Sequence, residues 1–263
     1  MKERKPLLAF LFVVLMVVFL TACSVNTEEI SNSADEAFNS RNYQAFNELY
    51  EKLNKANDEK ANNYLEKVKE NKLFSADSYN SISELSDGLD ELVVIEKEVP
   101  SLSEYAKMKS SELNSKFTIL KTVDYILVTQ APELESLVSK ANNPVILMQE
   151  YEDVKEAISA LETLSSDLNT HIINVEALDK KDSNSTGLLE AMKSQKENID
   201  SKINYLKTNS AKIISSNSLI LEGNIFGLMN STDISQEMES IDSQIAISLS
   251  DLKQRATNLK TIY

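Results

Sequence analysis

Apolar side chains recur at helical spacing along most of the chain, and this pattern predicts long amphipathic helices. From Asn143 and Pro144, a helix cap followed by a first-turn proline, the pattern tightens into seven-residue repeats. The repeats form three columns: Leu147, Val154, Leu161, Leu168 and Val175; Met192, Ile199, Leu206, Ile213 and Ile220; and Met238, Ile245, Leu252 and Leu259. Sustained columns of this kind are typical of coiled-coil packing.

The expected helices cover about residues 34–72, 82–99, 101–141, 144–179, 186–222 and 233–262. Ser81 with Glu84, and Ser101 three residues before Glu104, are capping pairs that predict the second and third helix starts. Pro132 should kink or interrupt the third helix. Short connections favour antiparallel neighbours. The sequence therefore predicts an all-α fold, an elongated bundle of about six long antiparallel helices with coiled-coil-like packing.

Composition narrows the class of protein further. The 263 residues include only four Gly and four Pro, too few for a β-sandwich or for glycine-rich phosphate loops. The formal net charge of −14 argues against a nucleic-acid partner, which needs a basic face. A single Cys and a single His exclude a disulfide framework, a Cys-rich zinc site and a His-based zinc site.

The first 23 residues carry a targeting signal. Lys2, Arg4 and Lys5 form a basic segment, and residues 6–20 follow with no charge. This run is short for a membrane span of about 20 residues but suits the apolar region of a signal peptide. It ends in Leu20-Thr21-Ala22-Cys23, which resembles the lipobox of bacterial lipoproteins: a leucine, two small residues and the obligatory cysteine.

The resemblance implies that the Cys23 thiol receives a diacylglyceryl group and that signal peptidase cuts between Ala22 and Cys23. Residues 1–22 would be the signal peptide, 23–33 a lipidated, polar tether, and 34–263 one helical bundle domain. The protein would then be held by lipid at the extracytoplasmic face of the cell membrane. The alternative is an uncleaved transmembrane anchor followed by a chance cysteine.

No catalytic, cofactor-binding or metal-binding residues are expected. His171 has no second imidazole to support a hydrolytic triad, and we interpret it as a histidine at the edge of the bundle. The loop over residues 182–187 resembles the front half of an EF-hand, but its twelfth position is Lys193 instead of the bidentate glutamate. We interpret the loop as a helix–helix turn rich in capping residues.

Three further patterns leave alternatives open. One group resembles the first helix of a tetratricopeptide repeat, and its aromatics are equally suited to a core: Ala34, Ala37, Asn42, Tyr43, Ala45 and Tyr50. The apolar stretch 219–229 is either a partner-binding elbow or a helix end that turns into the core. Four polar residues spaced by seven line either a ligand cavity or the solvated edge of a helix, the second being favoured: Gln195, Lys202, Asn209 and Ser216.

Two functions follow, and neither is enzymatic. The first is a lipid-anchored, non-catalytic scaffold or binding protein that contacts an envelope component or a protein partner. Its layout of lipobox, short tether and charged helical body is similar to that of helical lipoproteins described as cell-wall binding in Gram-positive bacteria. The alternative is a ligand-binding or sensory module that holds a small molecule or peptide between helices. Neither function requires a cofactor.

Overall fold

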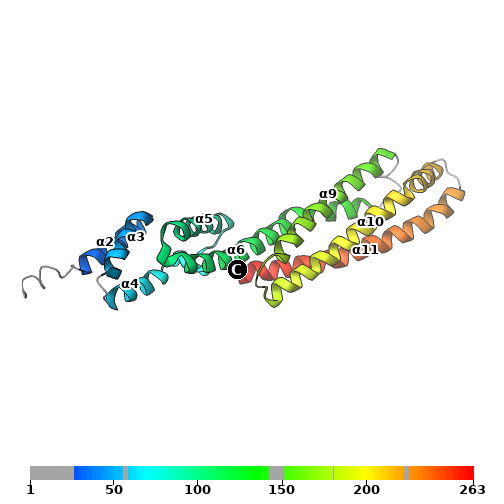
Figure 1. The fold of residues 1–263 in the computed structure, drawn as a ribbon. Coiled ribbons are helices and arrows are strands. Elements are labelled where there is room, and N and C mark those ends of the chain that lie inside the picture. The colour runs from blue at the N-terminus through cyan, green and yellow to red at the C-terminus, as the bar shows by residue number, and fades with distance from the viewer. Residues whose placement is uncertain (1–26, 56–58, 142–150, 180, 222–224) are drawn as a thin grey trace, which may run out of the picture. The chain divides into compact units, whose positions relative to one another are not determined.

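The computed structural model describes residues 27–55, 59–141, 151–179, 181–221 and 225–263. Every regular element within these residues is a helix, which confirms the predicted all-α fold (Figure 1). The α-helices are α2 (Thr27–Asn39), α3 (Tyr43–Lys55), α4 (Glu59–Lys69), α5 (Ile82–Glu98), α6 (Ser103–Asp124), α7 (Ala131–Ala141), α9 (Tyr151–Glu176), α10 (Ser183–Leu221) and α11 (Ile225–Ile262). Short 3₁₀ turns form η1 (Lys72–Phe74), η2 (Ala76–Ser78) and η3 (Pro100–Leu102), and η4 (Tyr125–Gln130) is a π-helix.

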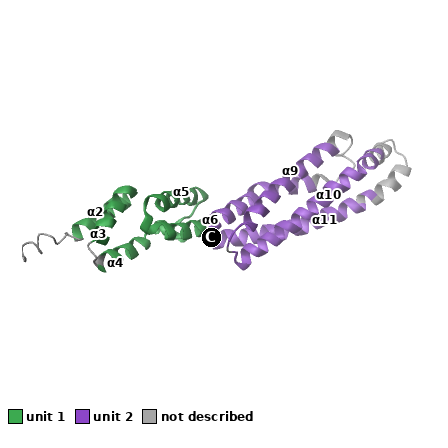
Figure 2. Ribbon diagram, viewed as in Figure 1, with its two compact units in different colours: residues 1–113 green, residues 114–263 purple. Residues whose placement is uncertain are grey.

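The chain divides into two compact units, residues 1–113 and residues 114–263, and the boundary falls within α6 (Figure 2). The stretch 34–263, expected as one helical bundle domain, therefore extends over two compact units. The physical reason is visible in the sequence, because the seven-residue columns begin only in unit 2. Unit 1 is built instead from shorter helices around aromatic side chains.

An aromatic core holds unit 1 together. Phe38 lies edge-on to Tyr43 and Phe46, with ring centroids 5.5 and 5.0 Å apart. Phe74 packs against Phe38 and Tyr105. Such edge-to-face pairs add about 0.5–1.5 kcal/mol each beyond the area they bury. The residues that suggested a repeat helix serve this core, and these are buried: Ala34, Ala37, Tyr43 and Tyr50.

The single helix expected over residues 34–72 is wrong, because this stretch belongs to α2, α3 and α4. Asn42 separates the first two: its side-chain oxygen accepts a hydrogen bond from the Ala45 amide at 3.3 Å, as a helix cap does. Helix α2 also begins at Thr27, inside the segment expected to be a tether. Glu28 and Glu29 lie in its first turn, where negative charge favours the helix dipole.

The predicted starts and interruptions of the next helices are only partly correct. Ser81 caps α5, accepting a hydrogen bond from the Glu84 amide at 3.2 Å. Residues 100–102 form a 3₁₀ turn instead of the predicted cap at Ser101, and α6 begins at Ser103. The interruption expected at Pro132 takes the form of η4. A proline ring clashes with the carbonyl four residues earlier, and a π-helical turn widens the backbone at that point.

Unit 2 is an antiparallel helical bundle, and its polar contacts establish the helix directions. Lys207 on α10 pairs with Glu162 on α9 at 2.6 Å, while the earlier Lys193 on α10 pairs with the later Glu176 on α9. Helices α10 and α11 also run in opposite directions. Near the end of α6, Thr122 contacts His171 of α9 at 3.0 Å. Neighbouring helices of this unit therefore run in opposite directions, as predicted.

The described members of the three seven-residue columns form the core of unit 2. They are buried without exception: Val154, Leu161, Leu168, Val175, Met192, Ile199, Leu206, Ile213, Met238, Ile245, Leu252 and Leu259. Leu147 and the predicted cap at Asn143 and Pro144 lie outside the described residues, as does the Ile220 side chain. The start expected near residue 233 for the last helix is wrong, because α11 begins at Ile225.

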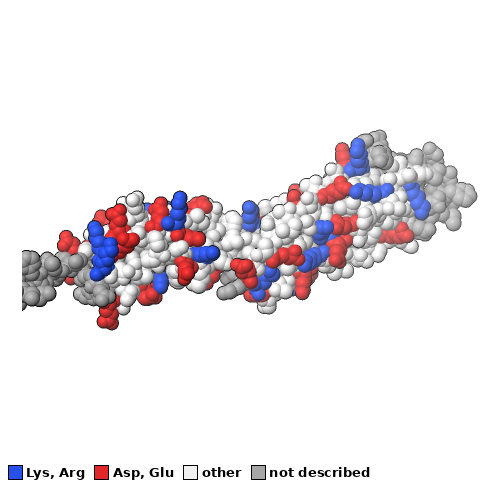
Figure 3. Space-filling model, viewed as in Figure 1, with Lys and Arg blue, Asp and Glu red and all other residues white. Residues whose placement is uncertain are grey.

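Charged side chains occupy the exposed faces of the helices. On the face drawn in Figure 3, acidic side chains are spread over both units and basic side chains lie among them. Of the helices that the structure describes, none has both the length and the apolar character that a membrane span requires.

The favoured interpretation of Gln195 and Lys202 as a solvated helix edge is wrong, because both are buried in the α10–α11 interface. Lys202 pairs with Asp242 of α11 at 2.7 Å, and each side chain is only 4% exposed. Ser248 of α11 donates a hydrogen bond to Gln195. The cavity beside Lys202 has a volume of about 20 Å³, which is room for about one water molecule. These polar residues therefore bind the two helices to each other and leave no space for a ligand.

Lys202→Met leaves the Asp242 carboxylate buried without its cation. We expect the free energy of unfolding to fall by about 3–5 kcal/mol. Lys202→Met combined with Asp242→Leu should recover most of that loss, because a well-packed apolar pair removes both desolvation penalties. Chemical denaturation followed by circular dichroism measures both changes.

Lys207→Met is the matched control for this test, because its ion pair with Glu162 is half exposed. It should change stability by less than about 1 kcal/mol. A double variant as unstable as Lys202→Met alone would show that the loss does not come from the unpaired Asp242 carboxylate.

Candidate functional site

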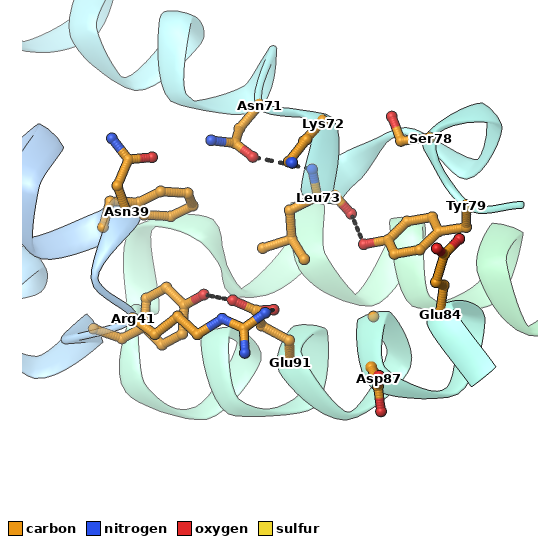
Figure 4. Close-up of a pocket in the computed structure, with 13 residues that line it drawn as sticks. Asn39, Arg41, Asn71, Lys72, Leu73, Ser78, Tyr79, Glu84, Asp87 and Glu91 are labelled. Atoms are coloured by element: carbon orange, nitrogen blue, oxygen red, sulfur yellow. Dashed lines mark hydrogen bonds and ion pairs between the residues drawn. The ribbon is translucent and has the colours of Figure 1, made fainter. Parts of the chain in front are cut away.

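A cavity of about 480 Å³ lies in unit 1, and its volume is in the range of small-molecule sites, about 300–1,000 Å³. The turn between α2 and α3, the segment containing η1 and η2, and α5 form its walls (Figure 4). The lining residues are Phe38, Asn39, Arg41, Tyr43, Asn71, Lys72, Leu73, Ser78, Tyr79, Glu84, Asp87, Gly88 and Glu91. The site therefore combines buried aromatic rings with charged groups of both signs.

Arg41 reaches the cavity from an unusual backbone position. Its φ of 62° is the only positive value at a non-glycine residue among the described residues. The Asn42 amide donates to the Ala37 carbonyl at 2.8 Å and the Arg41 amide to the Phe38 carbonyl at 3.0 Å, which is the Schellman pattern at a helix C-terminus. Glycine is the usual residue there, because the left-handed conformation costs other residues about 1–2 kcal/mol.

Three carboxylates line the cavity from α5. Glu84, Asp87 and Glu91 are spaced by three and four residues, so they lie on one face of this helix. Figure 4 shows Glu91 directed towards Arg41. The cap at Ser81 fixes where α5 begins and therefore sets which face carries these groups.

Glu91 is the most firmly held of the three carboxylates. Arg41 Nη2 lies 2.8 Å from Glu91 Oε2, and the buried Tyr43 hydroxyl donates a hydrogen bond to Glu91 Oε1. Burial, followed by this hydrogen bond, raises the pKa of Tyr43 well above its usual value. The Glu91 side chain is 12% exposed, whereas Arg41 is 71% exposed. The tyrosine therefore remains a donor, and the guanidinium extends from the pair into solvent.

Tyr79 and Gly88 shape another wall. The Tyr79 hydroxyl donates to the Leu73 carbonyl at 2.9 Å, which ties the segment after η2 to η1. A Cβ added at Gly88 would lie 2.6 Å from the Tyr79 ring, so the absence of a side chain lets the ring approach α5. Asn71 accepts a hydrogen bond from the Leu73 amide at 3.0 Å and caps η1. These contacts hold the wall in place without any bound molecule.

Two charged groups of the site have no hydrogen bond or ion pair to the described residues, namely the Lys72 ammonium and the Asp87 carboxylate. Glu84 accepts one hydrogen bond, from the Asn80 amide at 2.7 Å. The cavity therefore presents free charges of both signs beside the paired Arg41 and Glu91. Such an arrangement can bind a polar molecule by complementary charge.

The sequence-predicted lipidation and cleavage residues, Cys23 and Ala22, lie outside the described residues. Their role remains a prediction from the sequence. In the part of the chain that the structure describes, no group of His, Cys, Asp or Glu side chains could hold a metal ion.

His171 lies half-buried on α9. Its Nδ1 is 3.0 Å from Thr122 Oγ1, and its ring stacks on Tyr125 with centroids 4.3 Å apart. Burial, and then the nearby Lys121, lowers its pKa, while Asp167 acts in the opposite direction. Its contacts join α9 to the end of α6, in agreement with its interpretation as a structural residue of the bundle.

The loop that resembles part of an EF-hand serves as a helix start. Asp182 Oδ1 accepts a hydrogen bond from the Ser185 amide at 2.7 Å, and the hydrogen bonds of Ser185 lower the Asp182 pKa. Lys193, at the position of the missing calcium ligand, pairs with Glu176. The favoured interpretation as a capping turn agrees with these contacts.

Comparison with known proteins adds no relative. No family model matches the chain, and neither a curated protein nor a solved structure matches it.

The sequence reasoning missed the unit 1 cavity. Its residues come from three segments between positions 38 and 91; the first, together with Asn71 and Lys72 of the second, was assigned to one continuous helix. The cluster Asn39-Ser40-Arg41-Asn42 was an available signal, since Asn and Ser favour turns and caps. The spacing of Glu84, Asp87 and Glu91 alone would not have distinguished a site from a solvated helix face.

Arg41→Gly and Arg41→Ala both remove the guanidinium, but only glycine relieves the left-handed backbone. We expect Arg41→Gly to be more stable than Arg41→Ala by about 1 kcal/mol, measured by chemical denaturation. Both variants also leave Glu91, whose side chain is 12% exposed, without its cation, and this cost is the same for the two. Equal stability of the two variants would contradict the strain assigned to this position.

His171 should make stability depend on pH below its ordinary pKa of about 6.5. Because its pKa is lowered in the folded state, the unfolded chain binds the proton more tightly, so acid favours unfolding. The stability of the wild type relative to His171→Gln should therefore decrease between about pH 7.5 and about pH 5.5. Denaturation curves at the two pH values measure this difference. As the chain has one His, a constant difference would refute the assignment.

Proposed function

We propose that the protein is a lipid-anchored bacterial lipoprotein at the extracytoplasmic face of the cell membrane. The observation that carries the proposal is Leu20-Thr21-Ala22-Cys23, placed directly after the uncharged run 6–20 and the basic residues before it. The order and spacing of these features match the lipoprotein signal. The only cysteine of the chain lies at the position where acylation requires a thiol.

The charge of the chain supports attachment to the membrane through a lipid instead of electrostatic adsorption of the protein to the headgroups. Cleavage after Ala22 would remove three of the 27 basic residues and one of the 41 acidic residues, leaving a net charge of −16. Anionic headgroups repel such a body. Two acyl chains contribute about 0.8 kcal/mol per buried CH₂ and give stable attachment where one chain is marginal.

The function proposed for the anchored protein is binding, without catalysis, of an envelope component or a protein partner. Support comes from the layout of the sequence, which is similar to that of helical cell-wall-binding lipoproteins. Helices with exposed, mixed-charge faces suit contact with polar partners (Figure 3).

A second candidate is a module that binds a small molecule or peptide. The cavity of about 480 Å³ in unit 1 favours it, with its aromatic floor and its charged rim. In contrast to the earlier expectation for this class, the candidate site is lined by neither Gln195 nor Lys202, which pair within unit 2.

Cys23→Ala tests the anchor. Without its thiol there is no nucleophile to accept the diacylglyceryl group, and the class-specific peptidase does not process an unmodified precursor. The variant should retain the signal segment, have the larger precursor mass and incorporate no labelled palmitate. Lipid labelling together with intact-mass measurement is the appropriate assay.

Ser24→Ala is the matched control, because it changes the neighbouring small residue and leaves the thiol in place. It should be labelled and cleaved like the wild type. Membrane fractionation alone is a poor measurement, since residues 6–20 are apolar enough to remain inserted. An unlabelled wild-type chain that still begins near Met1 would overturn the lipoprotein proposal.

A further inference from the structure

We propose that the unit 1 cavity binds a small zwitterion with an ammonium group and a carboxylate group, the chemistry of an amino acid or a short peptide with free ends. The inference rests on the second candidate above, a ligand-binding module, and names its ligand class. It does not depend on the lipid anchor. Three features of the cavity carry it: a cationic side, a carboxylate side, and an apolar floor that is already in place.

Arg41 and Lys72 provide the cationic side. The Arg41 guanidinium contacts Glu91 through Nη2 and is otherwise exposed, so several of its five N–H donors remain for a carboxylate. Lys72 has no partner among the described residues and lines the same cavity from η1. Two cations from separate segments therefore border one opening.

The backbone of Arg41 strengthens this assignment. A glycine would satisfy the Schellman turn at lower energy, yet the chain has an arginine in the left-handed conformation. Its ion pair with Glu91 uses Nη2 and leaves the guanidinium 71% exposed. Backbone strain of this kind is concentrated at ligand-binding positions. The guanidinium therefore neutralises Glu91 and remains open to a ligand carboxylate as well.

Asp87 and Glu84 provide the carboxylate side. Asp87 has no partner in the described part of the chain, and Glu84 accepts only the Asn80 amide. Glu91 is already neutralised by Arg41 and bonded to Tyr43, so it does not compete for a ligand. The free carboxylates suit an ammonium group, while Lys72 and the exposed part of the Arg41 guanidinium suit a carboxylate.

The floor of the cavity is apolar and preformed. Phe38 and Tyr43 line the cavity and are buried, and Leu73 lies beside Tyr79 (Figure 4). The Tyr79 bond to Leu73 and the close approach of Tyr79 to Gly88 fix this wall. Contact with an apolar floor reduces solvent screening, which strengthens charge pairing at the rim. A molecule with a single charge would leave one side of the cavity unpaired.

The test uses the full chain in a nonionic detergent and a synthetic pool of amino acids and of di-, tri- and tetrapeptides with free ends. The same peptides, acetylated and amidated, form the capped pool. Equilibrium dialysis with mass spectrometry measures which peptides the protein retains at about 1 mM. We expect retention from the free pool, and affinity for the retained peptides should fall about tenfold or more in Arg41→Gly and in Asp87→Asn.

Matched variants separate the site from general charge. Lys67→Ala removes a cation of similar exposure, 70%, that pairs with Asp35 and does not line the cavity. Asp90→Asn neutralises another carboxylate of α5 outside the lining. Both should bind like the wild type. Melting temperatures of all variants are measured in parallel, and Arg41→Gly should remain folded because it relieves backbone strain.

The other outcomes each overturn a defined part of the inference. The protein could retain capped peptides as well as free ones, with no loss of affinity in Arg41→Gly or Asp87→Asn. This result would overturn the zwitterion but leave the binding module. An equal loss of affinity in Lys67→Ala and Asp90→Asn would show that net charge causes the effect, and it would overturn the site. No retention from either pool would overturn both the zwitterion and the binding module.

Discussion

The ammonium of Lys202 and the carboxylate of Asp242 meet at 2.7 Å in a part of unit 2 where each side chain is 4% exposed. Burial lowers the pKa of Lys202 and raises that of Asp242, so the charge of each group depends on the presence of the other. Since an unpaired charge there is strongly unfavourable, α10 and α11 can pack only in the register that brings these residues together. Apolar columns alone would permit a slip by one seven-residue repeat, and the polar pair excludes it.

In unit 1, hydrogen bonds from neutral hydroxyl groups likewise determine which helices pack together. Tyr43 and Tyr64 lie in the aromatic core, and their hydroxyls donate to Glu91 and Asp35 at its edge. A buried hydroxyl without a partner would oppose burial of its ring. These two bonds connect α3 to α5 and α4 to α2, so the core of unit 1 specifies which helices meet. The cavity follows from this packing, because the bond from Tyr43 places Glu91, and with it Arg41, at the rim.

The two units differ in how their polar side chains are paired. In unit 2, Lys202 and Asp242 pair with each other and the adjoining space holds about one water molecule, while the Gln195 amide nitrogen is buried without a partner among the described residues. In unit 1 two charges at the cavity have no partner in the described residues, and one neighbour occupies a strained backbone position. Charged groups at the unit 1 cavity are therefore open to solvent, whereas the buried Lys202 and Asp242 of unit 2 are paired.

Local sequence signals determined the helical class, the capped start of α5, the interruption near Pro132 and the buried columns of unit 2. These depend on spacing of three, four or seven residues, which the chain itself fixes. The tertiary structure alone decided whether a polar residue on a helix faces solvent or a partner. The sequence alone predicts that Lys202 is a surface residue; in the structure it pairs with Asp242, forty positions away. Nothing in the sequence distinguishes Asp87 from Glu91, since both are carboxylates on one face of α5. Only the contacts of Glu91 with Tyr43 and Arg41 show that Glu91 is paired and Asp87 is free. The physical reason is that charge pairing and desolvation are set by neighbours in space, whereas periodicity is set by neighbours along the chain.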